Sequence, residues 1–383
     1  MRQIKVVIGS SFGDEGKGLM TDYFCSKAQK RGEKCIVVCS NGGSQRGHTV
    51  DTSKGEHHVF HHFGSGVFSG AYTYLPEPFI VNPIAFRREY EELAGLGYFP
   101  TVYVNPDCQV TTPYDMMLNQ ILEEHRNAAK HGSCGIGIYE TIHRSEAGYG
   151  TNAKSILQSG NKDFLGIIKE YLPKRISELG FEIPSDWKAI LYNPGIIDTY
   201  LDDCAYMRER IRFATDAVLK LYPNIVFENG QGLLLDRENM EYFPHLTPSH
   251  TGIRNSWTII SRTFVPEEYN LEVCYVTRTY MTRHGAGRFD TECPKEFLNP
   301  DMMDETNVPN PHQDTLRYGT LDGNQLIARI EKDMSEVKRK KITKSIAITH
   351  LNEYNLTEEN KQAFSKFTGK IYCSYGKCRE HVK

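Results

Sequence analysis

The sequence has no run of about 18 apolar residues, the length that a helix needs to cross the apolar part of a bilayer. Residues 1–18 pass from a short β-branched run into a glycine-rich segment, without the apolar stretch of a signal peptide. The mean hydropathy of -0.49 is typical of a chain whose surface faces water. We therefore expect a cytoplasmic protein with no membrane partner.

Paired cysteine motifs are also missing. The ten cysteines are scattered without CxxC spacing, which is typical of reduced thiols and argues against structural zinc. The formal net charge is only -3, from 45 basic and 48 acidic residues. Such a chain has no basic field to attract a nucleic-acid backbone, so we expect no nucleic-acid partner.

Strand-like and helix-like segments alternate along the chain, which is typical of an α/β fold with a mostly parallel central sheet flanked by helices. The expected strands are residues 4–8, 35–39, 79–81, 101–104, 190–192, 225–227, 273–277 and 345–349, and the expected helices are residues 16–30, 83–93, 116–130, 203–221 and 323–333. We expect one large domain, residues 1–383, with inserted loops. The longest loop, residues 294–317, has the composition of a functional lid.

A glycine-rich loop follows the first expected strand and opens the first expected helix. It reads Gly9-Ser-Ser-Phe-Gly-Asp-Glu-Gly-Lys-Gly18, and backbone N–H groups at such a turn can hold phosphate. The loop is P-loop-like but is not a Walker A motif, because Gly18 stands where that motif has Ser or Thr. Asp14 can ligate Mg²⁺ or take a proton, and Lys17 can neutralise phosphate charge. The alternative is a tight turn without a ligand.

Three later loops carry further polar groups. His48, which follows strand 35–39, can stabilise charge on a transferred phosphoryl group, although a lone histidine is more often structural. Gln231 lies in the glycine turn after strand 225–227 and offers a donor and an acceptor to a purine edge, or it is a satisfied loop amide. The hydroxyls of Thr247 and Ser249 suit a monophosphate but equally an ST-turn.

In this order the motifs resemble the adenylosuccinate synthetase family, whose members carry a GDEGKGK-type loop, an NAGHT-type loop, an EGAQG strand end and a TSS-type loop. Here these motifs stand at residues 13–18, 45–49, 228–232 and 247–249. A further family segment, Ser-Thr-Arg-Val-Gly-Ala-Gly, reads Met281-Thr-Arg-His-Gly-Ala-Gly287 in this chain. Several motifs in one order, over most of the chain, are far more specific than any one of them.

The resemblance implies a ligase that phosphorylates the 6-oxo group of a purine nucleotide and replaces it with aspartate. Asp14 is then the base that removes the purine N1 proton. Asp14 and the backbone carbonyl of Gly47 are also the implied Mg²⁺ ligands. His48 is the acid that assists phosphoryl transfer, and Lys17 is the phosphate-loop lysine. The residues implied in nucleotide or phosphate binding are Gly13, Glu15, Gly16, Gly18, Gln45, Gly47, Thr49, Ser133, Arg144, Gln231, Thr247 and Asn352. Arg144 is implied to come from the second subunit of a homodimer.

Two departures from the family pattern bear on the substrates. Cellular members recognise the guanine of GTP with a TKLD motif, whereas this chain has Thr349-His-Leu-Asn352. An amide matches an adenine edge, so we expect ATP as the phosphoryl donor. The arginine-rich loop for aspartate is replaced, and only Arg317 remains recognisable. Arg317 and Arg283 are therefore our candidates for binding the carboxylates of L-aspartate.

These departures, with a chain shorter than typical cellular members, resemble the viral branch of the family, the 2-aminoadenylosuccinate synthetases that act on dGMP. Viral members carry Ser at the loop aspartate, whereas this chain keeps Asp14. The leading hypothesis is an ATP-dependent, Mg²⁺-requiring ligase that joins L-aspartate to dGMP, giving N6-succino-2-amino-2′-deoxyadenylate in a host cytoplasm. The alternatives are an adenylosuccinate synthetase acting on IMP and a nucleotide-binding regulator without turnover.

Overall fold

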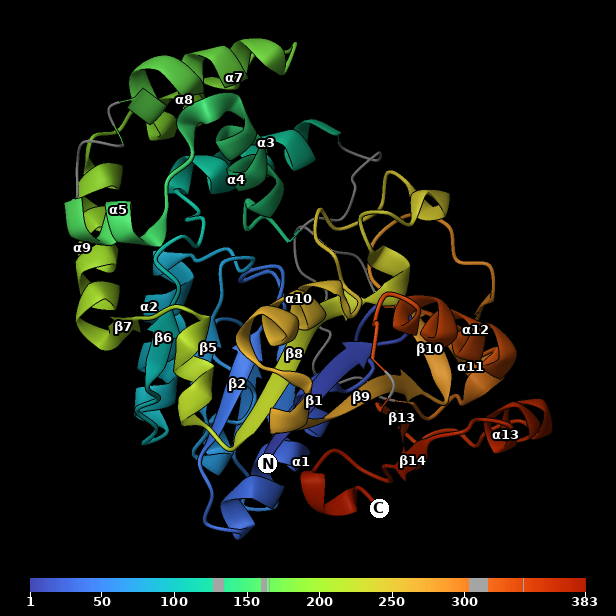
Figure 1. The fold of residues 1–383 in the computed structure, drawn as a ribbon. Helices are drawn as coiled ribbons and strands as arrows, with labels where there is room; N and C mark the ends of the chain where they lie inside the picture. Colours follow the sequence, from blue (N-terminus) through green and yellow to red (C-terminus); the bar gives the residue numbers. More distant parts are fainter. Residues whose placement is uncertain (127–133, 160–163, 165, 303–315, 340) are drawn as a thin grey trace.

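A nine-stranded sheet forms the centre of the molecule, in the order β14-β13-β9-β1-β8-β2-β5-β6-β7. The computed structural model describes residues 1–383 except 127–133, 160–163, 165, 303–315 and 340 (Figure 1). Every neighbouring pair of strands in this sheet is parallel. The expected α/β fold with a parallel central sheet flanked by helices is confirmed.

Helices cover both faces of the central strands. The strands of the sheet are β1 (Arg2–Gly9), β2 (Cys35–Cys39), β5 (Tyr72–Leu75), β6 (Val102–Val104), β7 (Ile211–Phe213), β8 (Asn224–Gly232), β9 (Tyr269–Arg278), β13 (Thr343–Thr349) and β14 (Lys370–Cys373). Side chains alternate between the faces, so Val6 and Ile8 join one apolar cluster and Val7 joins another. The first cluster includes residues of α10 (Arg254–Thr263) and α12 (Gly323–Met334), and the second includes residues of α1 (Lys17–Lys30).

A third apolar cluster holds a mainly helical region beside the β6 and β7 edge of the sheet (blue-green to yellow-green in Figure 1). Its helices are α2 (Pro83–Gly95), α3 (Pro113–Arg126), α4 (Ile138–Arg144), α5 (Ala153–Ser159), α7 (Leu172–Glu178), α8 (Ser185–Leu191) and α9 (Gly195–Arg210). The small sheets pair β3 (His48–Asp51) with β4 (His57–Phe60), and β10 (Tyr280–Arg283) with β12 (Arg317–Thr320), which also pairs with β11 (Glu292–Cys293). The described part of the chain also contains α11 (Lys295–Leu298) and α13 (Glu358–Ser365).

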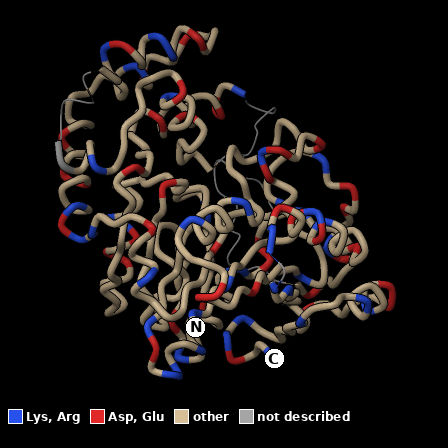
Figure 2. Tube along the Cα trace, viewed as in Figure 1, with Lys and Arg blue, Asp and Glu red and all other residues tan. Residues whose placement is uncertain are grey.

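Charge of both signs is interspersed along the described trace (Figure 2). Among the described residues, no helix combines the length and the apolar character needed to cross a membrane.

Three sequence-based expectations about secondary structure are wrong. Residues 190–192, expected as a strand, lie at the end of α8, because a short apolar run does not separate strand from helix. Residues 79–81 form only isolated bridges, to Gly43 and Val110. The helix expected over residues 203–221 ends at Arg210, where the chain enters β7 and pairs with β6. Tertiary pairing overrides local propensity at that point.

Candidate active site

A cavity of about 770 Å³ opens at the edge of the sheet where β1, β9 and β13 end. Ligands bind at the carboxyl ends of the strands in open parallel sheets, since the loops there converge. Four segments supply most of its lining: Asp14, Gly16, Lys17, Gly18 and Leu19; Ser44, Gln45, Gly47, His48, Thr49 and Asp51; Arg278, Tyr280 and His284; Thr349, His350, Asn352 and Glu353. The structure thus brings together Asp14, Lys17 and His48, as predicted from the sequence.

The glycine-rich loop is closed by the side chain of Glu15. One carboxylate oxygen of Glu15 accepts the backbone N–H groups of Ser11 (2.9 Å) and Gly13 (3.0 Å), and the other lies 2.7 Å from Nζ of Lys17. Both charged side chains are buried. Glu15 therefore holds the loop amides and the lysine itself, instead of facing the cavity.

Gly18 explains why this loop departs from the Walker A pattern. A Cβ at Gly18 would lie 2.6 Å from the carbonyl oxygen of Thr49, so a serine or threonine would displace β3. The close approach keeps the helix start against the strand that carries His48.

Asp14 is fixed at its backbone and at its side chain. Its φ of 60° is left-handed, which is uncommon for a residue other than glycine. Nε of Arg278 donates to its carbonyl oxygen (2.6 Å), and Nε2 of His284 lies 2.9 Å from its Oδ2. Burial favours the neutral carboxyl, but His284, with smaller contributions from Arg278 and Lys17, holds the pKa of Asp14 below its ordinary value. The carboxylate is therefore ionised at neutral pH.

His48 is held by a buried carboxylate. Its Nδ1 lies 3.0 Å from Oε1 of Glu228, and Arg46 lies 3.4 Å from the other oxygen. Burial alone raises the pKa of a carboxyl, but His48 and Arg46 lower the pKa of Glu228 to about 2. Burial lowers the pKa of His48, against the opposing effect of Glu228. Glu228 thus faces Nδ1 of His48, and within the described residues Nε2 is buried without a hydrogen-bond partner.

Two buried amides lie beside the turn at Gly42. A Cβ on Gly42 would lie 2.9 Å from Nε2 of Gln45 and 3.5 Å from Oε1 of Gln231. Both side-chain amide atoms of Gln45, and Oε1 of Gln231, are buried without a hydrogen-bond partner among the described residues. Buried polar groups are nearly always paired, so these atoms are suited to a ligand with donors and acceptors.

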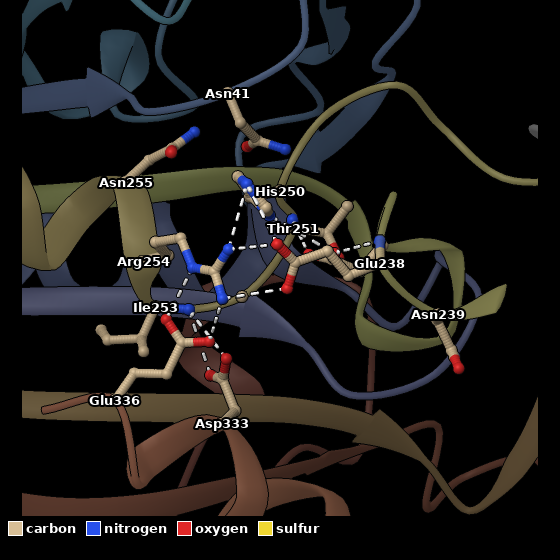
Figure 3. A network of polar contacts seen from close by, with 12 residues as sticks. Asn41, Glu238, Asn239, His250, Thr251, Ile253, Arg254, Asn255, Asp333 and Glu336 are labelled. Carbon is tan, nitrogen blue, oxygen red and sulfur yellow. Dashed lines mark hydrogen bonds and ion pairs between the residues drawn. The ribbon is translucent and has the colours of Figure 1, made fainter.

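The segment after Thr247 is tied to the sheet by a polar network (Figure 3). The side chain of Asn229 donates to the carbonyl oxygen of Thr251 (2.9 Å), and Arg254 pairs with Glu238 and Glu336. The acidic groups Asp236 and Glu238 converge with His250, but the guanidinium of Arg254 already supplies positive charge there. The network is therefore structural.

Three predicted binding residues have partners within the chain. The guanidinium of Arg144 is buried, where it makes two 2.9 Å hydrogen bonds to Asp115, so it does not extend toward a partner in this structure, and its contact with a second subunit stays a prediction. Arg317 pairs with Glu292 and donates to the carbonyl oxygens of Gly285 and Gly287. Arg283 is buried and stacks on the ring of Phe12, 4.4 Å from its centroid.

Neither Arg283 nor Arg317 lines the cavity, so the structure does not bring the predicted aspartate-binding pair to it. The same holds for Gly13, Glu15, Gln231 and Thr247, whereas Ser133 lies outside the described residues. The predicted residues that do line the cavity are Asp14, Gly16, Lys17, Gly18, Gln45, Gly47, His48, Thr49 and Asn352.

Sequence reasoning gave no role to Arg278, Glu228 or His284. Arg278 directly follows the strand expected at residues 273–277. Because ligand sites lie at the carboxyl ends of parallel strands, this position could have marked Arg278 as a site residue. His284 replaces the valine of the family segment, which is a second available signal. The partnership of Glu228 with His48 needs the pairing of β2 with β8 and had no signal in the sequence.

Known proteins resemble the chain in sequence and in fold. The family model described as adenylosuccinate synthetase matches residues 6–355. The adenylosuccinate synthetase of Mesoplasma florum is 31% identical over 303 residues, 77% of this chain and 67% of the relative. That of Microcystis aeruginosa is 29% identical over 308 residues, 76% of this chain and 63% of the relative. The match thus spans about two thirds of the length of these relatives.

Two solved structures share the fold. The fully ligated adenylosuccinate synthetase of Plasmodium falciparum has a TM-score of 0.74 and 16% identity, with 99% of both chains covered. The succinoaminodeoxyadenylate synthetase of cyanophage S-2L, bound to dGMP and dATP, has a TM-score of 0.64 and 14% identity, covering 100% of this chain and 95% of the other. Since the family model covers nearly the whole sheet and every cavity loop but the last, the chain belongs to the adenylosuccinate synthetase family.

Proposed function

We propose that the protein is a ligase that joins L-aspartate to C6 of a purine nucleotide at the expense of a nucleoside triphosphate. The observation that carries this proposal is the meeting of Asp14, Lys17 and His48 in one cavity at the carboxyl edge of the sheet. A base, a phosphate-binding lysine and an imidazole are the groups that such a reaction needs.

The proposed reaction has two steps, phosphorylation of the purine O6 and displacement of the phosphate by aspartate. Asp14 takes the N1 proton while the purine O6 attacks the γ-phosphorus, and the nucleoside diphosphate leaves. Lys17 neutralises charge on the transferred phosphoryl group, and His48 acts on it as an acid, donating an N–H from its ring to an oxygen that gains negative charge. The amine of aspartate then attacks C6 and loses one proton, which leaves with inorganic phosphate, and the phosphate carries the former O6. Phosphorylation thereby converts a poor leaving group into a good one.

Magnesium fits the oxygen ligands of the cavity. Asp14 and Gly47 both line it, and carboxylate and carbonyl oxygens are the ligands that Mg²⁺ prefers. The low pKa of Asp14 keeps its carboxylate available. When bound, the ion supplies positive charge to the phosphates, and chelation should therefore abolish turnover.

We propose ATP, or dATP, as the phosphoryl donor, because Asn352 lines the cavity just after β13. Guanine offers two adjacent donors, of which an amide satisfies one, whereas an amide matches the donor and acceptor of adenine. ATP should exceed GTP in initial rate by about 5- to 150-fold, which corresponds to about 1–3 kcal/mol for a lost hydrogen bond.

Asn352→Asp should reduce this preference and admit GTP. The matched control is Asn355→Asp, which adds the same charge three residues further on, outside the cavity lining. A parent protein that prefers GTP in side-by-side rates would show that the interpretation of Asn352 is wrong.

For the acceptor we propose dGMP, giving N6-succino-2-amino-2′-deoxyadenylate. The proposed use of ATP or dATP as phosphoryl donor, argued from Asn352, supports this choice. The S-2L enzyme of similar fold was solved with dGMP and dATP. IMP is the second candidate, because the curated relatives are adenylosuccinate synthetases. The test incubates the protein with ATP, aspartate and either dGMP, GMP or IMP, and identifies the succinylated product by mass. A product from IMP alone would reject dGMP.

His48→Ala should lower kcat by about 10²-fold or more with little change in nucleotide affinity, because its proposed contact forms in the transition state. The measurement is steady-state kinetics beside equilibrium binding of the purine nucleotide. His125→Ala is the control, since His125 is exposed on α3 outside the cavity lining. A change in KM alone would instead make His48 a binding residue.

A further inference from the structure

The imidazole of His284 lies against the carboxylate of Asp14 in the wall of the cavity. Its Nε2 lies 2.9 Å from Oδ2 of Asp14, and about a quarter of each side chain is exposed, 27% and 26%. His284 directly follows β10, whereas Asp14 belongs to the loop before α1, so the fold brings two distant segments together. A carboxylate only accepts hydrogen bonds, so Nε2 is assigned the proton and donates it.

The arrangement around Asp14 gives this contact a purpose. Asp14 has a left-handed φ, an uncommon backbone conformation that is kept only where surrounding contacts stabilise it. Arg278 secures the carbonyl oxygen, and His284 secures Oδ2. Oδ1 makes no hydrogen bond within the described part of the chain, and Asp14 lines the cavity. One carboxylate oxygen is therefore held while the other is left to a ligand.

The contact depends on the imidazole of His284, because a hydrocarbon side chain at this position could not donate a hydrogen bond to a carboxylate. A carboxylate held only by its backbone can rotate among staggered conformers, in which neither oxygen is fixed toward the purine.

We propose that His284 is a positioning residue, which holds Oδ2 of Asp14 so that Oδ1 meets the N1–H of the purine. This inference rests on the proposed role of Asp14 as the base. It assigns to His284 an effect on the rate of the first step and none on the binding of the nucleotide.

The test compares His284→Val with His284→Gln in the full chain. Valine removes the donor at a side chain that is about a quarter exposed, so the fold should accept it, and glutamine restores an N–H donor. His284→Val should lower kcat by about 10-fold or more, because a displacement of a reacting group by about 1 Å lowers the rate strongly. The KM for the purine nucleotide should stay within about twofold. His284→Gln should recover part of kcat, and all variants should share the parent's unfolding midpoint.

Two kinetic results would overturn the proposal. Unchanged kcat and KM in His284→Val would show that Asp14 needs no such support. A raised KM with unchanged kcat would make His284 a residue that binds the nucleotide. A loss in His284→Val that glutamine does not recover in any measure would also reject a role as hydrogen-bond donor.

A second measurement does not depend on turnover. Long-range ¹H–¹⁵N spectra of the protein with ¹⁵N-labelled histidine distinguish a proton on Nε2 from one on Nδ1, and the His284→Val variant assigns the signal. We expect Nε2 of His284 to carry a proton and its shifts to move in Asp14→Ala. A ring protonated only at Nδ1 rejects the contact. If the contact is found while no purine nucleotide is turned over, the proposed function fails, and the positioning role fails with it.

Discussion

Asp14→Asn should reduce turnover by about 10²-fold or more, which is the scale expected for the loss of a general base. An amide is nearly the same shape as the carboxylate but cannot take the N1 proton, and it offers Mg²⁺ no charge. The structure adds that the parent group is ionised, since His284 holds its pKa below the ordinary value. The measurement is the initial rate of succinylated product, with dGMP and IMP tested separately.

The fold of Asp14→Asn should be intact, because Arg278 donates to the backbone carbonyl and not to the side chain of this residue. Asp186→Asn is the matched control, since Asp186 is exposed on α8 outside the cavity lining. A rate within a few-fold of the parent, in a variant with normal nucleotide binding, would remove Asp14 from the role of base.

The meeting of the candidate residues Asp14, Lys17 and His48 in one cavity could be predicted, because it follows from chain topology. Asp14 stands in the loop after β1, and His48 begins β3 directly after the loop that follows β2, while parallel strands end at one edge of a sheet. Sequence patterns identify such strands and the glycine turns after them. The prediction therefore needed no knowledge of which side chains touch.

Predictions that depend on side-chain partners were less successful. Glu15 follows Asp14 directly in the sequence, yet its carboxylate turns back onto the loop amides and Lys17. Arg283 was expected to face aspartate but instead lies over Phe12 and donates to the carbonyl oxygen of Arg288. An arginine has a long, flexible side chain with five N–H donors, and the sequence does not show which acceptors the fold places within hydrogen-bond distance.

Arg144→Met should lower the free energy of unfolding by about 3–5 kcal/mol, because it leaves the charge of Asp115 buried without its partner. Only 1% of Arg144 is exposed, and its guanidinium also donates to the carbonyl oxygens of Val110 and Tyr149, both at 2.7 Å. The pair joins α4 to α3, so its loss should loosen the helical region of the molecule. Denaturant unfolding followed by circular dichroism measures the change.

The same variant distinguishes two roles of Arg144: a structural ion pair with Asp115, and the nucleotide binding that the family resemblance implies. If Arg144 held the 5′-phosphate of a nucleotide in a partner subunit, Arg144→Met would raise KM and leave stability unchanged. From its present contacts we expect the opposite result, a large loss of stability. Arg144→Lys keeps the charge but loses the planar fork that makes two hydrogen bonds to Asp115, so it should lie between Arg144→Met and the parent. Arg88→Ala removes an exposed ion pair with Glu92 and should leave the unfolding midpoint unchanged, since solvent-exposed pairs contribute little.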